Sequence, residues 1–294
     1  MQIAFHIGAN CTDEDRLLKS ALKNAEMLLQ RGIAVPGPSK YRRLLRETLQ
    51  ALDGVSPRPG TRDILIDAIV EDDDVKRVVL SNDNFIAIPK RIFDHGQFYP
   101  QADSKLRNLR KVFAEDEISL YLGIRNPASF LQETLRRSEC KSLGEYLGFL
   151  APDQLRWSDV IARIRHAAPQ ARLTVWCNED TPLIWEDILR SFCGVDDAVP
   201  LAGAHDLLDG LLTEAGLRRV LAQLADTAPE DRVARQEMIA DALESHARPE
   251  IMEDQIELPE LDAETVADLT DAYEDDLEVI ADMPGVDLIL PFDD

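Results

Sequence analysis

Short apolar runs alternate with amphipathic stretches along the first two thirds of the chain. The runs have no strict polar alternation, which is typical of strands buried on both faces of a parallel sheet. They lie at 3–7, 33–35, 77–81, 118–124 and 173–177. Apolar residues recur at helical spacing over 13–31, 39–52, 62–69, 104–114, 127–137, 142–150, 158–168 and 182–192. This alternation predicts a three-layer α/β fold, with a mainly parallel sheet flanked by helices.

The pattern changes beyond residue 195 and becomes acidic and mostly helical. Amphipathic stretches lie at 204–225, 232–245 and 262–283, and 286–290 reads as a short terminal strand. Prolines and acidic residues make 249–262 linker-like. We therefore expect an α/β core over 1–195 and an acidic helical region over 196–294 that packs on it.

Charge is distributed very unevenly between these two parts. Residues 196–294 hold 28 acidic residues against five arginines, which accounts for the whole net charge of −23, whereas residues 1–195 are balanced. Such a surface repels nucleic acid and anionic lipid. It favours a basic protein partner, or it serves solubility alone, and the sequence leaves both interpretations open. No feature of the sequence indicates an oligomeric state.

The remaining composition excludes several classes of protein. The first residues carry no basic segment before a long apolar stretch, and no run approaches the roughly 18 apolar residues of a membrane span, so we expect a cytoplasmic protein without a span. The cysteines are widely spaced and have no neighbouring histidine, which predicts reduced thiols and no metal site. They are Cys11, Cys140, Cys177 and Cys193. The signatures of P-loop nucleotide hydrolases, Rossmann dehydrogenases, α/β-hydrolases and zinc proteases are absent.

Three motifs occur in an order that points to a known family. The first motif is His-Ile-Gly-Ala at 6–9, which precedes a capped helix and Gly-Ile-Ala-Val-Pro at 32–36. The second is Tyr-Leu-Gly-Ile-Arg-Asn-Pro at 121–127. The third, over 262–290, is a helix followed by Pro-Gly-Val and the terminal apolar run. This order resembles that of the bacterial sulfotransferases, a P-loop-like family that transfers a sulfuryl group from 3′-phosphoadenosine 5′-phosphosulfate. The resemblance implies that the strand at 3–7 is central and that a phosphosulfate-binding loop follows it.

The loop at 10–15 departs from the family pattern. The family sequence is approximately His-Lys-Thr-Gly-Thr-Thr, whereas this chain has Asn-Cys-Thr-Asp-Glu-Asp. Cys11 stands where the resemblance places a lysine, Asp13 replaces a glycine, and three carboxylates are expected to face the space that a dianion would fill. We therefore expect the donor loop to be lost and no cofactor to bind. The candidate residues of the anion pocket are Gly8, Asn10, Cys11, Thr12, Arg125 and Ser129.

Arg125 matches the arginine that holds the 3′-phosphate in the family, and its planar fork suits a phosphate. The family serine about eight residues later is replaced by Glu133, and Ser129 is one turn earlier and is the candidate substitute. The alternative interpretation of Arg125 is an ordinary salt-bridged residue at the end of a strand.

A basic cluster follows the Pro-Gly-Pro at 36–38, where the resemblance places acceptor-side residues. Its members are Lys40, Arg42, Arg43 and Arg46, with Arg91 farther along the chain. An anionic ligand or an acidic partner would suit this cluster. The alternative is a solvated helix face, docked against the acidic C-terminal third.

A loop-like stretch at 89–100 contains His95 and Tyr99. Histidine is a common general base, so His95 is the candidate catalytic residue. The alternative is a structural histidine, because no orienting partner is identifiable in the sequence.

The sequence thus predicts a sulfotransferase-fold protein that is catalytically degenerate or non-canonical and acts as a binding or regulatory module. The first alternative is an active sulfotransferase that uses 3′-phosphoadenosine 5′-phosphosulfate, holds it through Arg125, and recruits Lys40 or Arg42 in place of the missing lysine. The second is a structural protein that engages a basic partner through its acidic C-terminal third.

Overall fold

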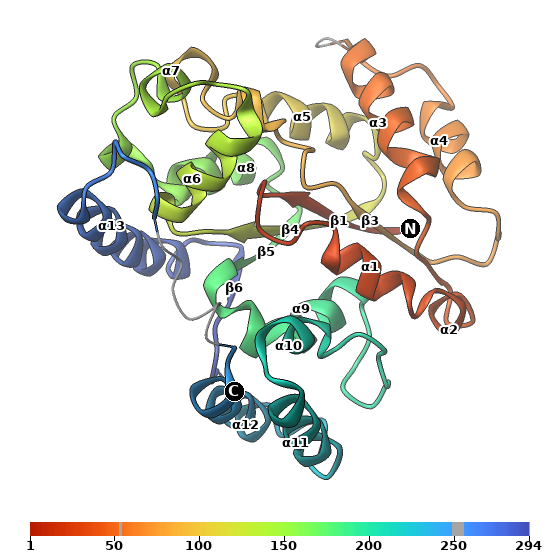
Figure 1. Cartoon of the computed structure of the whole chain (residues 1–294). Helices are drawn as coiled ribbons and strands as arrows, with labels where there is room; N and C mark the ends of the chain where they lie inside the picture. The colour runs from red at the N-terminus through yellow and green to blue at the C-terminus, as the bar shows by residue number, and fades with distance from the viewer. Residues whose placement is uncertain (53–54, 249–255, 294) are drawn as a thin grey trace.

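The structure, a computed structural model, describes residues 1–52, 55–248 and 256–293. Its centre is a six-stranded sheet in the order β2-β3-β1-β4-β5-β6, and every neighbouring pair is parallel. The strands are β1 (Gln2–Gly8), β2 (Ile33–Ala34), β3 (Arg77–Ser81), β4 (Glu117–Ile124), β5 (Arg172–Cys177) and β6 (Val286–Ile289). The predicted strands and the α/β fold class are confirmed, and β1 lies inside the sheet (Figure 1).

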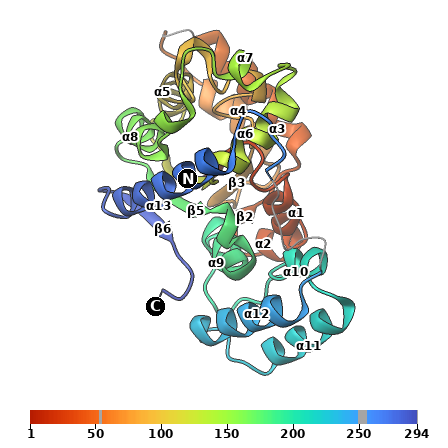
Figure 2. The ribbon, with the colours of Figure 1, turned by 60° about the vertical axis from the view of Figure 1, so that its left-hand side comes forward.

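Helices cover both faces of the sheet (Figures 1 and 2). One face carries α3 (Pro38–Leu52), α4 (Thr61–Ile69), α5 (Ala102–Val112), α6 (Pro127–Ser138), α7 (Leu143–Leu147), α8 (Trp157–Ala167) and α13 (Ala263–Ala281). The other carries α1 (Arg16–Leu22), α2 (Ala25–Leu29) and α9 (Thr181–Cys193). The arrangement is therefore a three-layer α/β fold.

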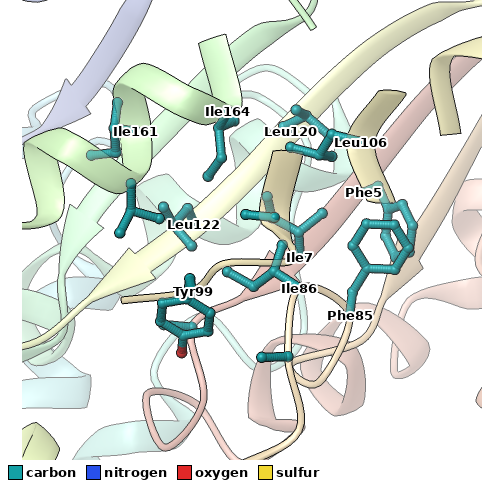
Figure 3. Close-up of a cluster of buried hydrophobic side chains, with 14 of the residues drawn as sticks. Phe5, Ile7, Phe85, Ile86, Tyr99, Leu106, Leu120, Leu122, Ile161 and Ile164 are labelled. Atoms are coloured by element: carbon teal, nitrogen blue, oxygen red, sulfur yellow. The ribbon is translucent and has the colours of Figure 1, made fainter. Parts of the chain in front are cut away.

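Alternation along the strands sends side chains into two separate cores. Ile3, Phe5 and Ile7 of β1 join the larger cluster, whereas Ala4 joins the smaller one. Figure 3 shows the larger cluster, in which side chains of β1 and β4 meet Leu106 of α5. Because both faces are covered, the strands are mostly apolar, which is why they could be recognised in the sequence.

The segment at 13–31 forms two helices instead of the single predicted one. The break falls at Asn24, which is buried. Its side-chain amide donates to the carbonyl of Ala202 at 2.8 Å and accepts from the Ala202 N–H at 2.8 Å. These two long-range hydrogen bonds hold the chain where the helix is interrupted, and no local sequence pattern indicates them. The predicted helix at 204–225 is likewise divided, into α10 (Asp206–Leu211) and α11 (Glu214–Ala225).

The C-terminal third contributes to the central sheet as well as to the helical region expected beyond residue 195. β6 pairs with β5, and Leu269, Tyr273 and Ile280 of α13 belong to the larger core. The helices α10, α11 and α12 (Arg232–His246) instead build a small hydrophobic cluster of their own. Residues 249–255, half of the linker-like segment, lie outside the described residues.

The basic helix α3 is not docked against the C-terminal third through ion pairs among the described residues. Lys40 pairs with Glu71 at 2.6 Å, Arg43 with Glu47 at 3.4 Å, and Arg42 with a residue of the first loop. In Figures 1 and 2, α3 and α10–α12 lie on opposite sides of the sheet. No helix within the described ranges is long and apolar enough to cross a membrane.

Candidate functional site

The site lies at the carboxyl end of β1, where the sheet order places the ends of β3 and β4 on either side. This edge of a parallel α/β sheet is the usual place for ligands. Gly8 has a φ of 141°, and a Cβ there would lie 3.2 Å from the carbonyl oxygen of Asp83. Glycine is therefore needed for the chain to leave the strand at this point, and we call residues 9–15 the β1–α1 loop.

The carboxylates of the β1–α1 loop do not face an anion space, contrary to the expectation. Glu14 binds the guanidinium of Arg137, and Asp15 binds that of Arg42 with contacts of 2.5 and 3.2 Å. Hydrogen bonds from these two arginines hold the pKa of Glu14 and of Asp15 below their usual values. The negative charge of the loop is thus largely compensated within the molecule, because long arginines from α3 and α6 reach it.

Asp13 occupies the backbone donors at the start of α1. Its carbonyl accepts from the Arg16 N–H at 2.8 Å, and its Oδ2 accepts from the Leu17 N–H at 3.1 Å. Asp13 thus satisfies two backbone donors of the first turn of α1, whose N-cap residue is Asp15. In P-loop-like sites such N–H groups would bind the anion, so Asp13 takes the place of a ligand.

The loop holds three residues other than glycine in the left-handed backbone region. The φ angles are 61° for Cys11, 52° for Glu14 and 64° for Asp15. Each such residue costs on the order of 1–3 kcal/mol and persists only where its surroundings enforce it. The arginine contacts of Glu14 and Asp15 provide that enforcement. Burial raises the pKa of the Cys11 thiol to about 11, so this side chain is a neutral thiol at physiological pH.

Arg125 and Ser129 are brought together as expected. The Arg125 Nε donates to Ser129 Oγ at 2.9 Å, and its Nη1 donates to the carbonyl of Cys11 at 2.9 Å. The arginine that the resemblance assigns to a phosphate therefore also contacts the β1–α1 loop. The two other loop candidates turn inward: the Asn10 Oδ1 accepts from the Tyr99 hydroxyl at 2.7 Å, and Thr12 donates to the Ala9 carbonyl at 2.8 Å.

The C-terminal helix α13 braces this side of the site. Asn126, which follows Arg125, donates through its side chain to Thr270 at 3.0 Å and through its backbone to Glu179 at 2.8 Å. Tyr273 of α13 donates to the same Glu179 at 3.2 Å. Burial raises the pKa of Glu179 above its usual value. These contacts fix the chain just after β4, where Arg125 lies, and no sequence motif indicates them.

A cavity of about 990 Å³ lies between α3 and α5, next to the chain that leaves β3. We call it the α3–α5 cavity. Its lining includes three members of the predicted basic set, Arg42, Arg46 and Arg91. Lys40 and Arg43, the other two, are absent from the lining and pair with Glu71 and Glu47.

Helix α5 supplies three further cations that the sequence interpretation missed, Lys105, Arg107 and Lys111. The available signal was the run Ser-Lys-Leu-Arg-Asn-Leu-Arg-Lys at 104–111, which places several cations beside a narrow apolar stripe. Its relation to α3 depends on tertiary packing. Over the part of the chain that the structure describes, the cavity lining thus contains six cationic side chains and no carboxylate.

Arg42 connects the cavity with the β1–α1 loop. It lines the cavity, binds Asp15, and donates through Nε to the carbonyl of Ser81 at 2.9 Å. Beneath it, the buried His6 ring lies 2.9 Å from the Ser81 hydroxyl. Burial, together with the neighbouring carboxylates of Asp13 and Asp15, raises the pKa of Asp83.

The candidate base His95 does not belong to this site. It is exposed, its φ is 61°, and it is absent from the cavity lining. Tyr99, four residues later, is fully buried and supports Asn10, so it serves the loop's structure. Among the described residues, no group of three or more histidine, cysteine or acidic side chains is arranged to hold a metal ion.

Comparisons with family models, curated proteins and solved structures find no match to this chain. Its function is therefore inferred from the geometry of the site.

Proposed function

We propose that this protein is a binding module for an organic polyanion, built on a sulfotransferase-like fold whose donor loop is closed. One observation carries the proposal: six cationic side chains line the α3–α5 cavity, without a carboxylate among the described residues that line it. Such a concentration of one charge in a concave site raises the local concentration of the opposite charge. The module would therefore take a ligand with several negative charges.

The floor of the cavity favours a ligand with an organic body. Phe5, Leu45, Leu49, Phe85 and Ile88 are among the lining residues. The rings of Phe5 and Phe85 have centroids 4.6 Å apart (Figure 3). Asn82 and Asn84 add neutral hydrogen-bonding groups to the lining. Apolar walls with a few polar groups are typical of small-molecule sites.

The closed donor loop supports a binding role over transfer. Asp13 occupies the first N–H groups of α1, and Glu14 and Asp15 occupy two arginines. A phosphosulfate would have to displace these internal partners, and Cys11 offers no positive charge in return. The resemblance to sulfotransferases is part of this proposal, and the internal position of β1 and the contact of Arg125 with the loop support it.

The alternative is an active sulfotransferase, and one observation favours it. Arg125 and Ser129 lie together at the loop, and Arg42 reaches the loop from α3 as a candidate replacement for the missing lysine. The two functions differ in where the donor nucleotide binds: at Arg125 in an active transferase, and in the α3–α5 cavity in a binding module.

Isothermal titration calorimetry with two probes separates these functions. We expect inositol hexakisphosphate to bind, and Arg46→Glu to weaken its affinity by about tenfold or more, which is about 1.4 kcal/mol. Arg43→Glu is the matched control, because Arg43 is exposed on the same helix but does not line the cavity. Adenosine 3′,5′-bisphosphate is itself an organic polyanion, so we expect its binding to be weakened by Arg46→Glu and left unchanged by Arg125→Ala.

Two results would overturn the proposal. Absence of polyanion binding, or equal weakening by the two glutamate variants, would remove the cavity as the site. Micromolar binding of adenosine 3′,5′-bisphosphate that Arg125→Ala abolishes would favour the active transferase.

A further inference from the structure

We infer that Lys105 is a covalent attachment site, whose amine forms an imine with an anionic carbonyl compound held in the α3–α5 cavity. The inference deepens the proposed function and rests on it, because the cavity must first collect the anion. The ligand class is an aldehyde or ketone that also carries a phosphate, sulfate or carboxylate group.

The position of Lys105 distinguishes it from the paired lysines of the chain. Its Nζ donates to the backbone carbonyl of Phe85 at 2.7 Å, and it forms no ion pair among the described residues. By contrast, Lys23 pairs with Asp206, Lys40 with Glu71 and Lys90 with Glu139. A carbonyl holds the amine in place without stabilising its charged form as a carboxylate would.

The surroundings favour the neutral amine. Burial of the side chain and the nearby Arg91 guanidinium lower the pKa of Lys105 to about 8. The charged side chains of the described residues that line the same cavity are cations from α3, α5 and the segment after β3: Arg42, Arg46, Arg91, Arg107 and Lys111. Three of them also pair with carboxylates outside the lining, Arg42 with Asp15, Arg91 with Asp94 and Arg107 with Asp103. Desolvation and neighbouring cations are the two means by which lysines become nucleophiles.

The geometry allows the neutral amine to attack the carbonyl carbon while it is still held by the Phe85 carbonyl. A neutral amine keeps two N–H bonds and one lone pair, so one N–H can remain on the Phe85 carbonyl while the lone pair faces the cavity. The side chain is partly exposed and lines the cavity, so a ligand there can approach Nζ. The other cations of the cavity lining would orient the ligand's anionic group.

The reaction balances without an oxidant or a reductant. The Nζ lone pair attacks the carbonyl carbon, and the carbon–oxygen π electrons move to the oxygen, which takes up a proton. The resulting carbinolamine has a new C–N bond. Loss of the second nitrogen-bound proton and of the hydroxyl group as water then gives the imine, so one water leaves for each bond formed.

Pyridoxal 5′-phosphate is a suitable probe because it combines an aldehyde with a phosphate. The protein is incubated with limiting probe at about pH 8, the imine is trapped by borohydride, and intact mass and peptide mapping locate the label. We expect one label per chain, on Lys105. Pyridoxal without the phosphate should label the protein about tenfold less at the same concentration, because it lacks the group that the cations hold.

Variants sharpen this test. Lys105→Arg should remove the label, whereas Lys111→Arg should keep it, since Lys111 lies on the same helix and lines the same cavity. Circular dichroism checks that both variants fold. If one of them does not, peptide mapping of the label on the unaltered protein still tests the inference. Labelling spread over the surface lysines, or a label that survives Lys105→Arg at full yield, would overturn the inference.

Failure of the inference and failure of the proposed function give different results. Pyridoxine 5′-phosphate has the phosphate but no carbonyl, so its calorimetric binding reports only the cavity. If it binds in competition with inositol hexakisphosphate while pyridoxal 5′-phosphate gives no imine, the attachment at Lys105 is wrong and the polyanion site stands. If neither polyanion binds, the proposed function itself fails.

Discussion

Arg42 is the residue on which the site depends most. Its guanidinium binds Asp15, its Nε donates to the carbonyl of Ser81, and its side chain lines the α3–α5 cavity. Removing it leaves a left-handed loop residue without its partner and takes away one of the two hydrogen bonds to the Ser81 carbonyl, which the Tyr41 hydroxyl also donates to at 2.7 Å. The cost therefore combines backbone strain with a lost hydrogen bond.

We expect Arg42→Ala to lower the free energy of unfolding by about 1–3 kcal/mol, a range discounted because the ion pair is partly exposed to solvent. Arg43→Ala, on the exposed side of α3, should change it by less than about 0.5 kcal/mol. Urea denaturation of both variants measures the difference. Equal stability of the two would mean that the Asp15 and Ser81 contacts contribute little, and the loop would then be held by Arg125 and Arg137.

At the residue scale, the sequence identified some partners and missed others. Five site residues could be identified in advance, because a motif or a cluster marked them in the sequence: Arg125, Ser129, Arg42, Arg46 and Arg91. Their contacts could not be predicted: the pairing of Glu14 with Arg137 joins residues far apart in the chain. The same limitation led the sequence interpretation to treat the loop carboxylates as exposed to an anion.

The elements of the fold follow the sequence more closely than the contacts do. Strands buried on both faces appear as plain apolar runs, so β1, β3, β4 and β5 were predicted within a residue or two. The divided helices were not, because Asn24 binds Ala202 and the Thr213 N–H donates to the carbonyl of His246 at 2.9 Å, far along the chain in both cases. The Thr213 side chain then caps the start of α11. The cavity was also beyond prediction, because it exists only where α3 and α5 face each other.

Close packing between β4, β5 and the β1–α1 loop gives a prediction at this scale. A Cβ on Gly123 would lie 3.0 Å from Trp176 Nε1 and 3.2 Å from Thr12 Oγ1. We expect Gly123→Ala to destabilise the fold by about 1–3 kcal/mol, because the indole is buried and has little room to shift. The β1–α1 loop should move with Thr12, so the change should also weaken polyanion binding.

Gly144 provides the matched control. It lies in α7, and a Cβ added there would meet no atom of the described residues within 4 Å, so alanine should stabilise the helix by about 0.5–1 kcal/mol. Thermal unfolding of the two variants should therefore shift in opposite directions. A Gly123→Ala protein as stable as the parent would show that the Trp176 side chain can yield, and the tight packing at the loop would be refuted.

At the scale of the whole molecule, charge is segregated. The α3–α5 cavity is cationic, whereas residues 196–294 carry the net charge of −23. An approaching polyanion meets the repulsion of the whole molecule at long range and the attraction of the cavity only at short range. Charge segregation of this kind acts on association rates more than on the fold. The association and the dissociation rate constants of a polyanion should therefore depend on salt for different reasons.

We expect the association rate constant of a labelled polyanion to rise when salt increases from about 0.01 M to about 0.15 M, because the Debye length falls from about 30 Å to about 8 Å and screens the distant acids first. The dissociation rate constant should rise as well, because the contacts inside the cavity weaken. Stopped-flow measurement with a fluorescent polyanion gives both constants.

The paired change Glu274→Gln and Asp275→Asn, at exposed positions of α13, should raise the low-salt association rate and leave dissociation unchanged. An association rate that falls steeply with salt would mean that the cavity's own field dominates at long range, and the repulsive role of the C-terminal third would be wrong.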